Sequence, residues 1–270
     1  VIAAREAKAG RELIVACGGD GTINEVAGGI LESGTDAELG ILPSGTGGDF
    51  RRSLAIPARA ADAARALRKS RVVQIDIGKV TCRGARSGVD ESRFFINVAS
   101  CGIAGEVVKH VKREPSRWIP AQRSSLLGGK ATFALAALQA TLSYKNVEIM
   151  IGLDEHRERA LTVANLSVAN ARFIGGGMKI APQAQLDDGL FEVIAVGDIS
   201  SLAMMAHAPR LYRGTHLGLR QVSHARAASL AVRSANPSER IAIEVDGELA
   251  GLLPARFEIV PRALRVRVPV

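Results

Sequence analysis

The residues from Gly18 to Asn24 combine a glycine-rich turn with a carboxylate, at a place where a chain can bind phosphate. The run Leu13–Cys17 before the turn is short and apolar, which is typical of a strand buried in a parallel sheet. After the turn, apolar residues recur every three or four positions, which predicts a helix over Thr22–Ser33. Glycines allow a tight turn, and the unpaired N–H groups at a helix start attract anions. The segment therefore predicts a phosphate site.

Asp20 conflicts with a phosphate at this turn, because both groups are negative. A carboxylate about 4 Å from a phosphate would cost roughly 4 kcal/mol at the effective dielectric of a protein surface. A divalent cation, or a substrate hydroxyl that Asp20 orients or deprotonates, would offset the repulsion, and both belong to phosphoryl transfer. The alternative is a plain turn, since Gly-Gly-Asp-Gly is a common turn composition.

The segment Leu39–Phe50 repeats the plan of an apolar strand followed by a glycine-rich turn, here with Thr46 and Asp49, and then a helix. Two such turns after neighbouring strands would meet at the carboxyl edge of one sheet, where open α/β sheets bind ligands. The first turn has neither the Gly-Lys-Ser/Thr of a P-loop nor the spacing of the dinucleotide fingerprint. We therefore expect a different nucleotide fold.

Two acidic segments follow in the second half of the chain. In Arg240–Leu249, alternate apolar residues share one strand face while Glu244 and Asp246 lie on the other, and Asp-Gly then predicts a tight hairpin. A turn at the tip of rigid strands can present carboxylates for catalysis, although a purely structural hairpin explains the pattern as well. Asp187-Asp188 precedes a predicted strand, and paired acids suit a hard cation such as Mg²⁺. An Asx turn is the alternative for that pair.

Taken together, these motifs resemble the diacylglycerol kinase catalytic domain family, which includes bacterial lipid kinases related to diacylglycerol and sphingosine kinases. The resemblance rests on five segments in the same order along nearly the whole chain, namely Gly18–Thr22 with Pro43–Phe50, Phe95–Ile103, Gly175–Pro182, Asp187–Leu190 and Val245–Glu248. It implies an α/β plus mostly-β fold: a phosphofructokinase-like nucleotide-binding domain over residues 1–73, truncated at its amino end, and a β-sandwich-like lipid-substrate domain with inserted helices over residues 74–270. The resemblance leaves open that the last residues return to the first domain.

The resemblance also implies roles for individual residues. Glu248 would accept the proton of the lipid hydroxyl, with Asp246 beside it and Asp20 as a third catalytic carboxylate. A structural Mg²⁺ would be held by the carboxylate of Asp188 and the carbonyls of Gln185 and Leu190. ATP would be bound by the two glycine turns, through Gly18, Gly19, Asp20, Gly21, Thr22, Ile23, Asn24, Gly45 and Thr46.

Two departures from the family pattern concern the nucleotide. Family members usually have a strand, a helix and a second strand before the first glycine turn, with a threonine that helps bind nucleotide, whereas this sequence begins inside a later helix. Gly48 stands where many relatives have Asn, so a contact made by that side chain cannot be carried over.

Periodicity divides the chain into an α/β part and a β-rich part. Up to about Val73, strand and helix patterns alternate, with further helices expected over Asp49–Leu54 and Ala58–Lys69. Beyond it, alternation of period two predicts strands, interrupted by helical stretches. The strands are expected over 161–168, 191–196, 228–233, 240–245 and 264–268, and the helices over 105–111, 126–143 and 200–212.

Composition narrows the class and the location of the protein. With 270 residues and 47% hydrophobic content, the chain can bury a large core. Three widely spaced cysteines indicate neither a disulfide framework nor a zinc site and fit a reducing cytoplasm. The uncharged run 131–144 falls short of the roughly 20 residues that span a bilayer, so we expect a cytoplasmic, peripherally membrane-associated protein.

The formal net charge of +8 suggests an anionic partner. No zinc-finger spacing, RNA-binding aromatic signature or basic heptad array is present, so we expect no nucleic acid partner. Five cations lie between Lys109 and Arg123 around Trp118, which suits an anionic membrane surface, although a solvated loop explains them equally well. The sequence leaves a homodimer open.

The leading hypothesis is an ATP-dependent lipid kinase that phosphorylates a hydroxyl of diacylglycerol or a related lipid. An NAD kinase-like soluble kinase is the nearest alternative, since that family shares the Gly-Gly-Asp-Gly turn. A lipid- or nucleotide-binding module that has lost catalysis is the third. The histidines show no metal-ligand spacing and no Ser–His–acid arrangement, which excludes the common hydrolases.

Overall fold

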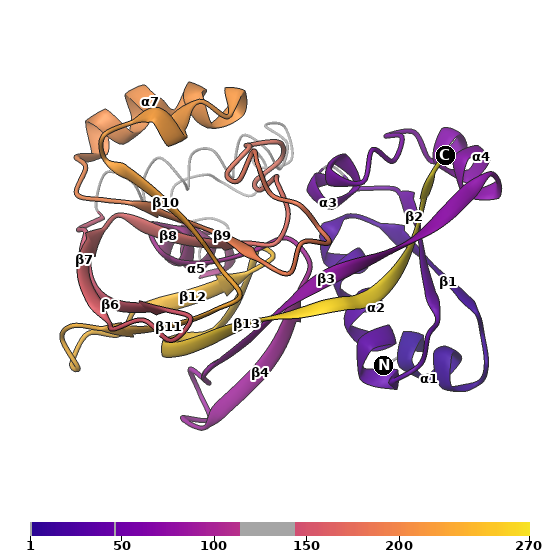
Figure 1. Cartoon of the computed structure of the whole chain (residues 1–270), viewed down its shortest axis with the longest axis horizontal. Helices are drawn as coiled ribbons and strands as arrows, with labels where there is room; N and C mark the ends of the chain where they lie inside the picture. The colour runs from indigo at the N-terminus through magenta and orange to yellow at the C-terminus, as the bar shows by residue number, and fades with distance from the viewer. Residues whose placement is uncertain (1, 46, 114–143) are drawn as a thin grey trace.

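The computed structural model describes residues 2–45, 47–113 and 144–270, with the backbone alone at 110–113. The described chain forms two lobes that are joined by two long strands (Figure 1). The amino-terminal lobe is built of strands and helices in alternation, and the second lobe is mostly sheet. The α/β plus mostly-β character expected from periodicity is therefore confirmed, whereas the phosphofructokinase-like description of the first lobe stays a prediction.

The first lobe is a small parallel sheet covered by helices. Strand β1 (Leu13–Gly18) pairs in parallel with β2 (Glu38–Pro43), and α2 (Asp20–Ser33) connects them. Helix α2 buries Ile23, Ala27 and Ile30 and ends at Gly34, whose left-handed conformation stops the helix. The remaining helices are α1 (Ile2–Lys8), α3 (Asp49–Ser53) and α4 (Ala60–Arg68).

The second lobe is an antiparallel sheet that curls around an apolar core. Along the main path the strands follow the order β10-β9-β8-β5-β12-β13-β11-β6-β7. The strands on this path are β5 (Val98–Gly102), β6 (Val147–Leu153), β7 (Arg159–Val163), β8 (Asn165–Ala169), β9 (Phe191–Val196), β10 (Val222–Ala227), β11 (Ser229–Ser234), β12 (Ala242–Val245) and β13 (Glu248–Pro269), and β4 (Asp90–Phe95) lies off it. Helices α5 (Ile103–Arg113) and α7 (Ser201–Arg213) and a short 3-10 helix, η1 (His216–Gly218), complete the lobe.

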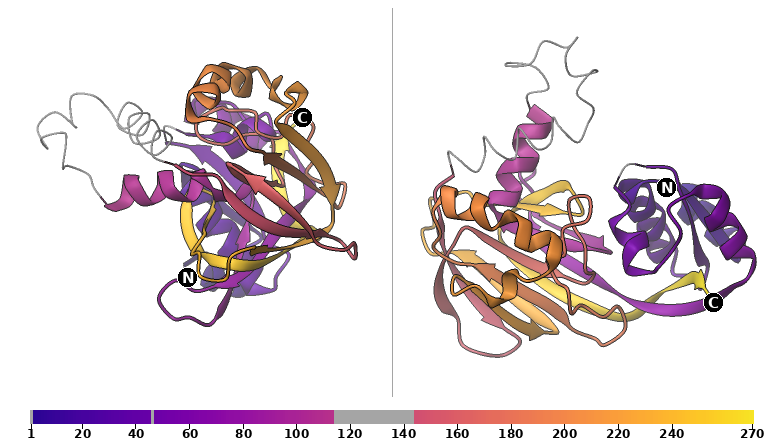
Figure 2. Two further views of the ribbon diagram at one scale, coloured as in Figure 1. Left: turned by 90° about the vertical axis from the view of Figure 1, so that its left-hand side faces the viewer. Right: turned by 90° about the horizontal axis from the view of Figure 1, so that it is seen from above.

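Strands β3 (Ser70–Arg83) and β13 (Glu248–Pro269) run through both lobes as an antiparallel pair (Figures 1 and 2). At its far end β13 pairs in parallel with β2, with Arg265 opposite Glu38. The last strand of the chain thus becomes part of the first lobe's sheet. The paired strands β3 and β13 therefore set the orientation of the glycine-rich turns relative to the second lobe.

Each lobe has its own apolar core. Phe50, Leu39 and Ile41 are fully buried in the first, together with Ile75 and Ile77 from β3. The second core includes Phe95 and Phe191, whose rings stack with centroids 5.6 Å apart. The residues Ile241, Ile243 and Val245 also belong to this core, as alternation along the strand predicted.

The elements agree with the sequence predictions where the periodicity is strong and differ elsewhere. Helix α2 begins at Asp20 rather than Thr22, and the expected strand 161–168 is divided at Ala164 into β7 and β8. Strands β4, β5, β6 and β10 were not predicted. The expected helix 126–143 lies outside the described residues, as do most of the uncharged run 131–144 and most of the cationic segment 109–123. Within the described residues, no helix has the length and apolar character needed to cross a bilayer.

Candidate active site

The two glycine-rich turns of the first lobe pack directly against each other. A Cβ at Gly45 would lie only 2.6 Å from the Cα of Gly19, and the N–H of Ser44 donates to the carbonyl of Gly18 at 3.0 Å. A Cβ at Gly47 would lie 2.6 Å from Oδ2 of Asp20. Real Cβ atoms do not approach so closely, so these positions need glycine for space. This contact confirms the expectation that the two turns lie together at the ends of neighbouring strands.

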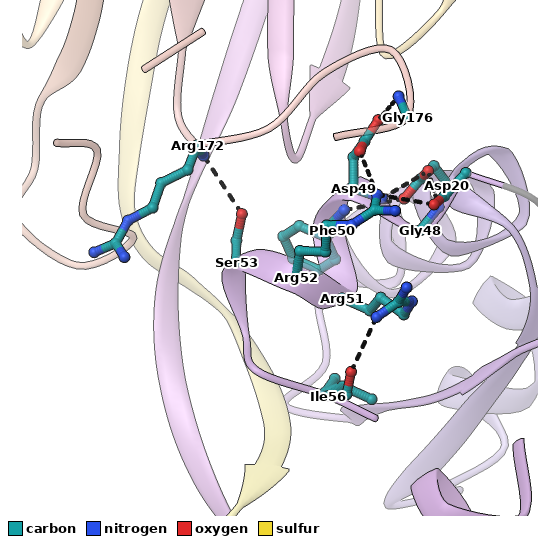
Figure 3. Close-up of polar contacts among 11 residues, drawn as sticks. Asp20, Gly48, Asp49, Phe50, Arg51, Arg52, Ser53, Ile56, Arg172 and Gly176 are labelled. Carbon is teal, nitrogen blue, oxygen red and sulfur yellow. Dashed lines mark hydrogen bonds and ion pairs between the residues drawn. The ribbon is translucent and has the colours of Figure 1, made fainter. Parts of the chain in front are cut away.

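Asp20 joins the two turns through its carboxylate (Figure 3). Oδ2 accepts hydrogen bonds from the N–H of Gly48 at 2.7 Å and of Asp49 at 3.0 Å, and Oδ1 accepts from the N–H of Phe50 at 3.0 Å. These are N–H groups at the start of α3, which have no partner within their own helix. Three backbone donors thus stabilise the negative charge of Asp20, which on sequence grounds conflicted with a bound phosphate. The catalytic role of Asp20 stays a prediction.

The start of α2 keeps the features of an anion site. Its N-cap is Gly19, and no side chain caps it. Gly21 and Thr22 are exposed, so the N–H groups of the first turn are open to a ligand. Ile23 differs, because its side chain is buried in the core and its N–H already donates to the carbonyl of Gly19. Asn24 is half-buried and Gly45 exposed, while Thr46 lies outside the described residues.

Asp49 links the two lobes (Figure 3). Its Oδ1 accepts from Arg52 at 2.7 Å, and its Oδ2 accepts from the N–H of Gly176 at 2.7 Å, in the loop that follows β8. Burial raises the pKa of the Asp49 carboxyl, and the charge of Asp20 raises it further, while the Gly176 N–H and Arg52 act in the opposite direction. Arg52 also donates to the carbonyl of Gly47 at 2.9 Å. The second glycine turn is therefore held from both lobes.

Gly48 has a positive φ of 73°, a conformation that glycine adopts freely and asparagine tolerates best among the other residues. A Cβ there would also lie 2.5 Å from Nε of Arg51, the end of a flexible side chain. The backbone N–H of Gly48 is engaged by Asp20. The substitution of Asn by Gly therefore keeps the turn and removes only what a side chain could add.

The acidic hairpin of the second lobe is a two-residue turn between β12 and β13. Asp246 and Gly247 have φ values of 48° and 85°, as in a type I′ turn, and Val245 pairs with Glu248 across it. Both Asp246 oxygens accept backbone N–H groups: Ile96 at 2.8 Å, Asn97 at 3.0 Å and Val98 at 3.0 Å. The predicted hairpin is therefore confirmed, and Asp246 fixes it to the loop before β5.

The charges of the two lobes act on one another across the site. Burial raises the pKa of the Asp246 carboxyl to about 6, although three N–H donors favour its ionised form, and the charge of Asp20 raises it as well. The first glycine turn and the acidic hairpin thus lie within electrostatic range of each other. Glu248, next to this turn, is exposed. An exposed carboxylate at the rim of such a site can accept a proton from a bound alcohol.

Comparisons with known proteins agree with this arrangement. Residues 2–80 match the profile of the diacylglycerol kinase catalytic domain, and residues 117–268 match that of the YegS C-terminal NAD kinase beta sandwich-like domain. A diacylglycerol kinase of Staphylococcus saprophyticus is 32% identical over 271 residues, which cover 99% of this chain and 80% of the relative. A diacylglycerol kinase of Bacillus subtilis strain 168 is 30% identical, covering 96% of this chain and 78% of the relative. The chain belongs to the diacylglycerol kinase family.

Solved structures share the family's fold. A crystal structure assigned as a diacylglycerol kinase from Bacillus anthracis superposes with a TM-score of 0.74 at 23% identity, over 100% of this chain and 83% of that one. Yeast NADH kinase, solved with NADH, superposes with a TM-score of 0.53 at 9% identity, over 96% of this chain and 62% of that one. At these identities the likeness concerns the fold alone.

The family resemblance implies a magnesium site at the turn Asp187–Leu190, which the structure describes. Oδ1 of Asp188 accepts from the N–H of Leu190 at 3.1 Å, and Oδ2 is ion-paired with Arg226. Carboxylate and carbonyl oxygens are the ligands that Mg²⁺ prefers, so the chemistry of this turn fits the ion. Oδ2 of Asp188, however, is already paired with Arg226. Within the described part of the chain, no three acidic, histidine or cysteine groups gather into a cation site. Magnesium at Asp188 stays a prediction, in competition with the guanidinium.

Two residues that sequence reasoning missed organise this region. Asp76 on β3 is 1% exposed, and its carboxylate accepts from the N–H of Gly189 and of Arg262, each at 2.7 Å. Asn170 donates to the carbonyls of Asp76 and Ile96 at 2.9 and 3.1 Å. A charged residue inside the apolar run 73–77 was a signal for Asp76, because such groups are buried only when they have partners. Nothing in the sequence singled out Asn170.

We expect Gly45→Ala to destabilise the protein by about 1–3 kcal/mol, because the new methyl group would overlap the backbone of Gly19 rather than a movable side chain. Gly28→Ala is the matched control, since nothing lies within 4 Å of its Cβ position in α2. Alanine is the better helix former, so the control should gain roughly 0.5–1 kcal/mol. Urea unfolding of both variants measures the difference, and a Gly45→Ala protein as stable as the parent would contradict the packing of the two turns.

Mg²⁺ and Arg226 should compete for Asp188. In nucleotide-free protein we expect Mg²⁺ to raise the melting temperature, Asp188→Ala to abolish that rise and to lower activity, and Arg226→Ala to reduce the half-saturating Mg²⁺ concentration. A partly exposed ion pair contributes at most about 1 kcal/mol, which limits the reduction to about five-fold. Arg233→Ala, which removes a surface ion pair with Glu158, is the control and should have no such effect. A magnesium response that is the same in Asp188→Ala and the parent would place the ion elsewhere.

Proposed function

We propose that the protein is an ATP-dependent lipid kinase that transfers the γ-phosphoryl group to a hydroxyl of diacylglycerol or a related lipid. The observation that carries the proposal is the juxtaposition of the glycine turns with the acidic hairpin. Asp49 and Gly176 tie the lobes together at 2.7 Å, and the charge of Asp20 reaches Asp246. A triphosphate bound at the first turns would therefore lie near an alcohol held beside Glu248.

The first step is binding of the phosphates. The open N–H groups of the first turn of α2 supply donors and the positive end of the helix dipole. The glycines at 18, 19 and 21 let a phosphate approach the backbone closely. A magnesium ion that accompanies the nucleotide would neutralise part of the phosphate charge.

The second step is transfer. The lipid hydroxyl oxygen attacks the γ-phosphorus, the bond from that phosphorus to the β,γ-bridging oxygen breaks, and ADP leaves with the electron pair. The proton of the hydroxyl passes to the carboxylate of Glu248, which is exposed at the start of β13. Asp246 contributes by fixing the turn through three backbone N–H groups, rather than by contact with the substrate.

The substrate implies a place of action. A kinase that phosphorylates a diacylglycerol must work at a membrane surface, so we propose peripheral association on the cytoplasmic side, without a nucleic acid partner. The cationic residues between Lys109 and Arg123 support this proposal through their charge. Binding to vesicles that contain anionic lipid, compared with neutral vesicles, tests the association, and sedimentation tests the homodimer that the sequence leaves open.

The assay that tests the proposal offers labelled ATP with diacylglycerol in mixed micelles and, side by side, with NAD. Transfer of label to the lipid supports the proposal. Transfer to NAD supports the soluble kinase, for which the distant NADH kinase fold is the one structural argument. Nucleotide binding without transfer to any lipid would support a module that has lost catalysis.

Glu248→Gln should reduce lipid phosphorylation by roughly 10²- to 10⁴-fold while nucleotide affinity stays within two-fold, because the amide cannot accept the proton. Glu258→Gln is the matched control: it lies on the same strand, pairs with Arg256 on the surface and should keep parental turnover. Turnover by Glu248→Gln equal to that of the parent would exclude Glu248 as the base.

A further inference from the structure

Glu244 is a buried carboxyl next to the acidic hairpin, and the proposed reaction assigns it no role. It lies on β12, two residues before Asp246, and is 2% exposed. Alternation along the strand places it on the face opposite Ile243 and Val245, which belong to the second core. Helix α5 packs closely on this part of the strand, since a Cβ at Gly105 would lie 2.9 Å from the carbonyl oxygen of Ala242. Glu244 is therefore a buried acid on the helix-covered face.

Only one oxygen of Glu244 has a regular hydrogen-bond partner in the described structure. Oε2 accepts from the N–H of Gly247 at 2.9 Å, within the turn that leads to Glu248. Oε1 is buried and accepts no hydrogen bond of normal geometry from the described residues. Ser100 lies directly opposite Glu244 on β5, and its hydroxyl is close enough to lower the pKa of the carboxyl slightly. The Ser100 hydroxyl can accept a hydrogen bond from a protonated Oε1 or donate one to an ionised Oε1, so it is a partner for either form. The cost of burying a charge favours the neutral acid.

Ser100 belongs to a short row of polar side chains on the same face. It pairs with Ser167 on β8, and the two hydroxyl oxygens are 3.4 Å apart. Asn165 donates to the Ser167 hydroxyl at 2.9 Å. The row offers oxygen acceptors to a proton on Glu244 and brings no cation beside it. Its chemistry thus suits a neutral acid better than an ion.

The strand is also irregular at this residue. The register of β12 against β13 shifts between Ile243 and Glu244, so that Ile243 pairs with Gly251 and Glu244 with Leu249. A bulge of this kind leaves an extra residue on one strand and re-aims the side chains beside it. The hydrogen bond from Gly247 to Glu244 spans the turn between the bulge and Glu248. Asp246 holds one side of the turn, and Glu244 holds the other.

We propose that Glu244 is a positioning residue, which carries a proton on Oε1 and fixes the Asp246–Gly247 turn so that Glu248 faces the substrate hydroxyl. The proposal rests on the assignment of Glu248 as the base. Burial raises the pKa of Glu244 to about 8, and the neighbouring Asp246 charge adds to the rise, while the Gly247 N–H opposes it. A glutamine has the same shape and no charge, so it should replace Glu244 without loss.

Among the described residues, the other charged groups around Glu244 are few. Asp246 lies in the turn that follows the same strand, and Glu248 begins β13. Glu106 and Lys109 lie on α5 and pair with each other, and the charge of Asp20 in the first lobe acts on Asp246. Cys101 on β5 is buried, and burial raises its thiol pKa to about 12, so it stays neutral through the neutral range. Glu244 is therefore the group whose proton should be lost near pH 8.

The kinetic test compares Glu244→Gln and Glu244→Leu in lipid phosphorylation by the full chain. Glu244→Gln should keep kcat within two-fold of the parent at pH 7 and hold it above pH 8, where parental kcat falls as Glu244 ionises. Glu244→Leu should lose at least ten-fold in kcat, with the KM for ATP within two-fold, because the turn loses its acceptor. Glu38→Gln alters another buried carboxyl, one paired with Arg265 and Arg267, and should leave the alkaline limb in place.

Two kinetic results would overturn the proposal. If Glu244→Gln lost as much activity as Glu248→Gln, Glu244 would act in its ionised form. If Glu244→Leu folded and kept parental kcat and pH dependence, the turn would not need Glu244.

A measurement without substrate separates this proposal from the proposed function. A carboxyl whose pKa is raised on folding binds more protons in the folded state, so its stability contribution is lost as pH rises from the unfolded pKa of 4.5 towards 8. Asp246 acts in the same direction only up to about pH 6. Between pH 6 and pH 8, the melting temperature should therefore fall more in the parent than in Glu244→Gln. Equal slopes would overturn the neutral form of Glu244, whereas absence of lipid phosphorylation in the parent would overturn the proposed function alone.

Discussion

The site depends on carboxylates that accept hydrogen bonds from runs of backbone N–H groups. Asp20 binds three successive N–H groups at the start of α3, and Asp246 binds three at the start of β5. Asp76 binds two more, in segments separated from it by more than a hundred residues. Turns and helix starts leave such N–H groups without partners, and burying them unpaired would cost free energy. Each carboxylate therefore fixes a loop that the sheet cannot fix, and together they bring distant motifs to one place.

This construction concentrates negative charge where an anionic nucleotide is expected. The charge of Asp20 raises the pKa of both Asp49 and Asp246. The N–H donors and Arg52 offset part of the negative charge of these carboxylates, and Glu244 would add to that charge if it were ionised. A neutral Glu244 lets the hairpin have its acceptor without a further negative charge. Positioning and electrostatics thus favour the same protonation state.

The sequence predicted the motifs well and their interactions poorly. The glycine turns, the helix after Asp20 and the hairpin at Asp246 could be predicted because local rules decide them, and β9 has its predicted bounds. The role of Asp20 toward a cation or hydroxyl stays a prediction. Its three N–H donors could not be predicted, because they come from a turn 28 to 30 residues away. The alternation of apolar residues along the strand placed Glu244 on the face opposite the core. Its burial comes from tertiary packing, which a single strand pattern cannot show.

The central claim is that a triphosphate bound at the glycine turns lies within reach of an alcohol at Glu248. A crystal structure with a non-hydrolysable ATP analogue tests it most directly. The account predicts the γ-phosphate on the side of the α2 start that faces the β12–β13 hairpin, with room for a hydroxyl between the phosphorus and the Glu248 carboxylate. A nucleotide bound elsewhere, or one whose γ-phosphate points away from the hairpin, would contradict it.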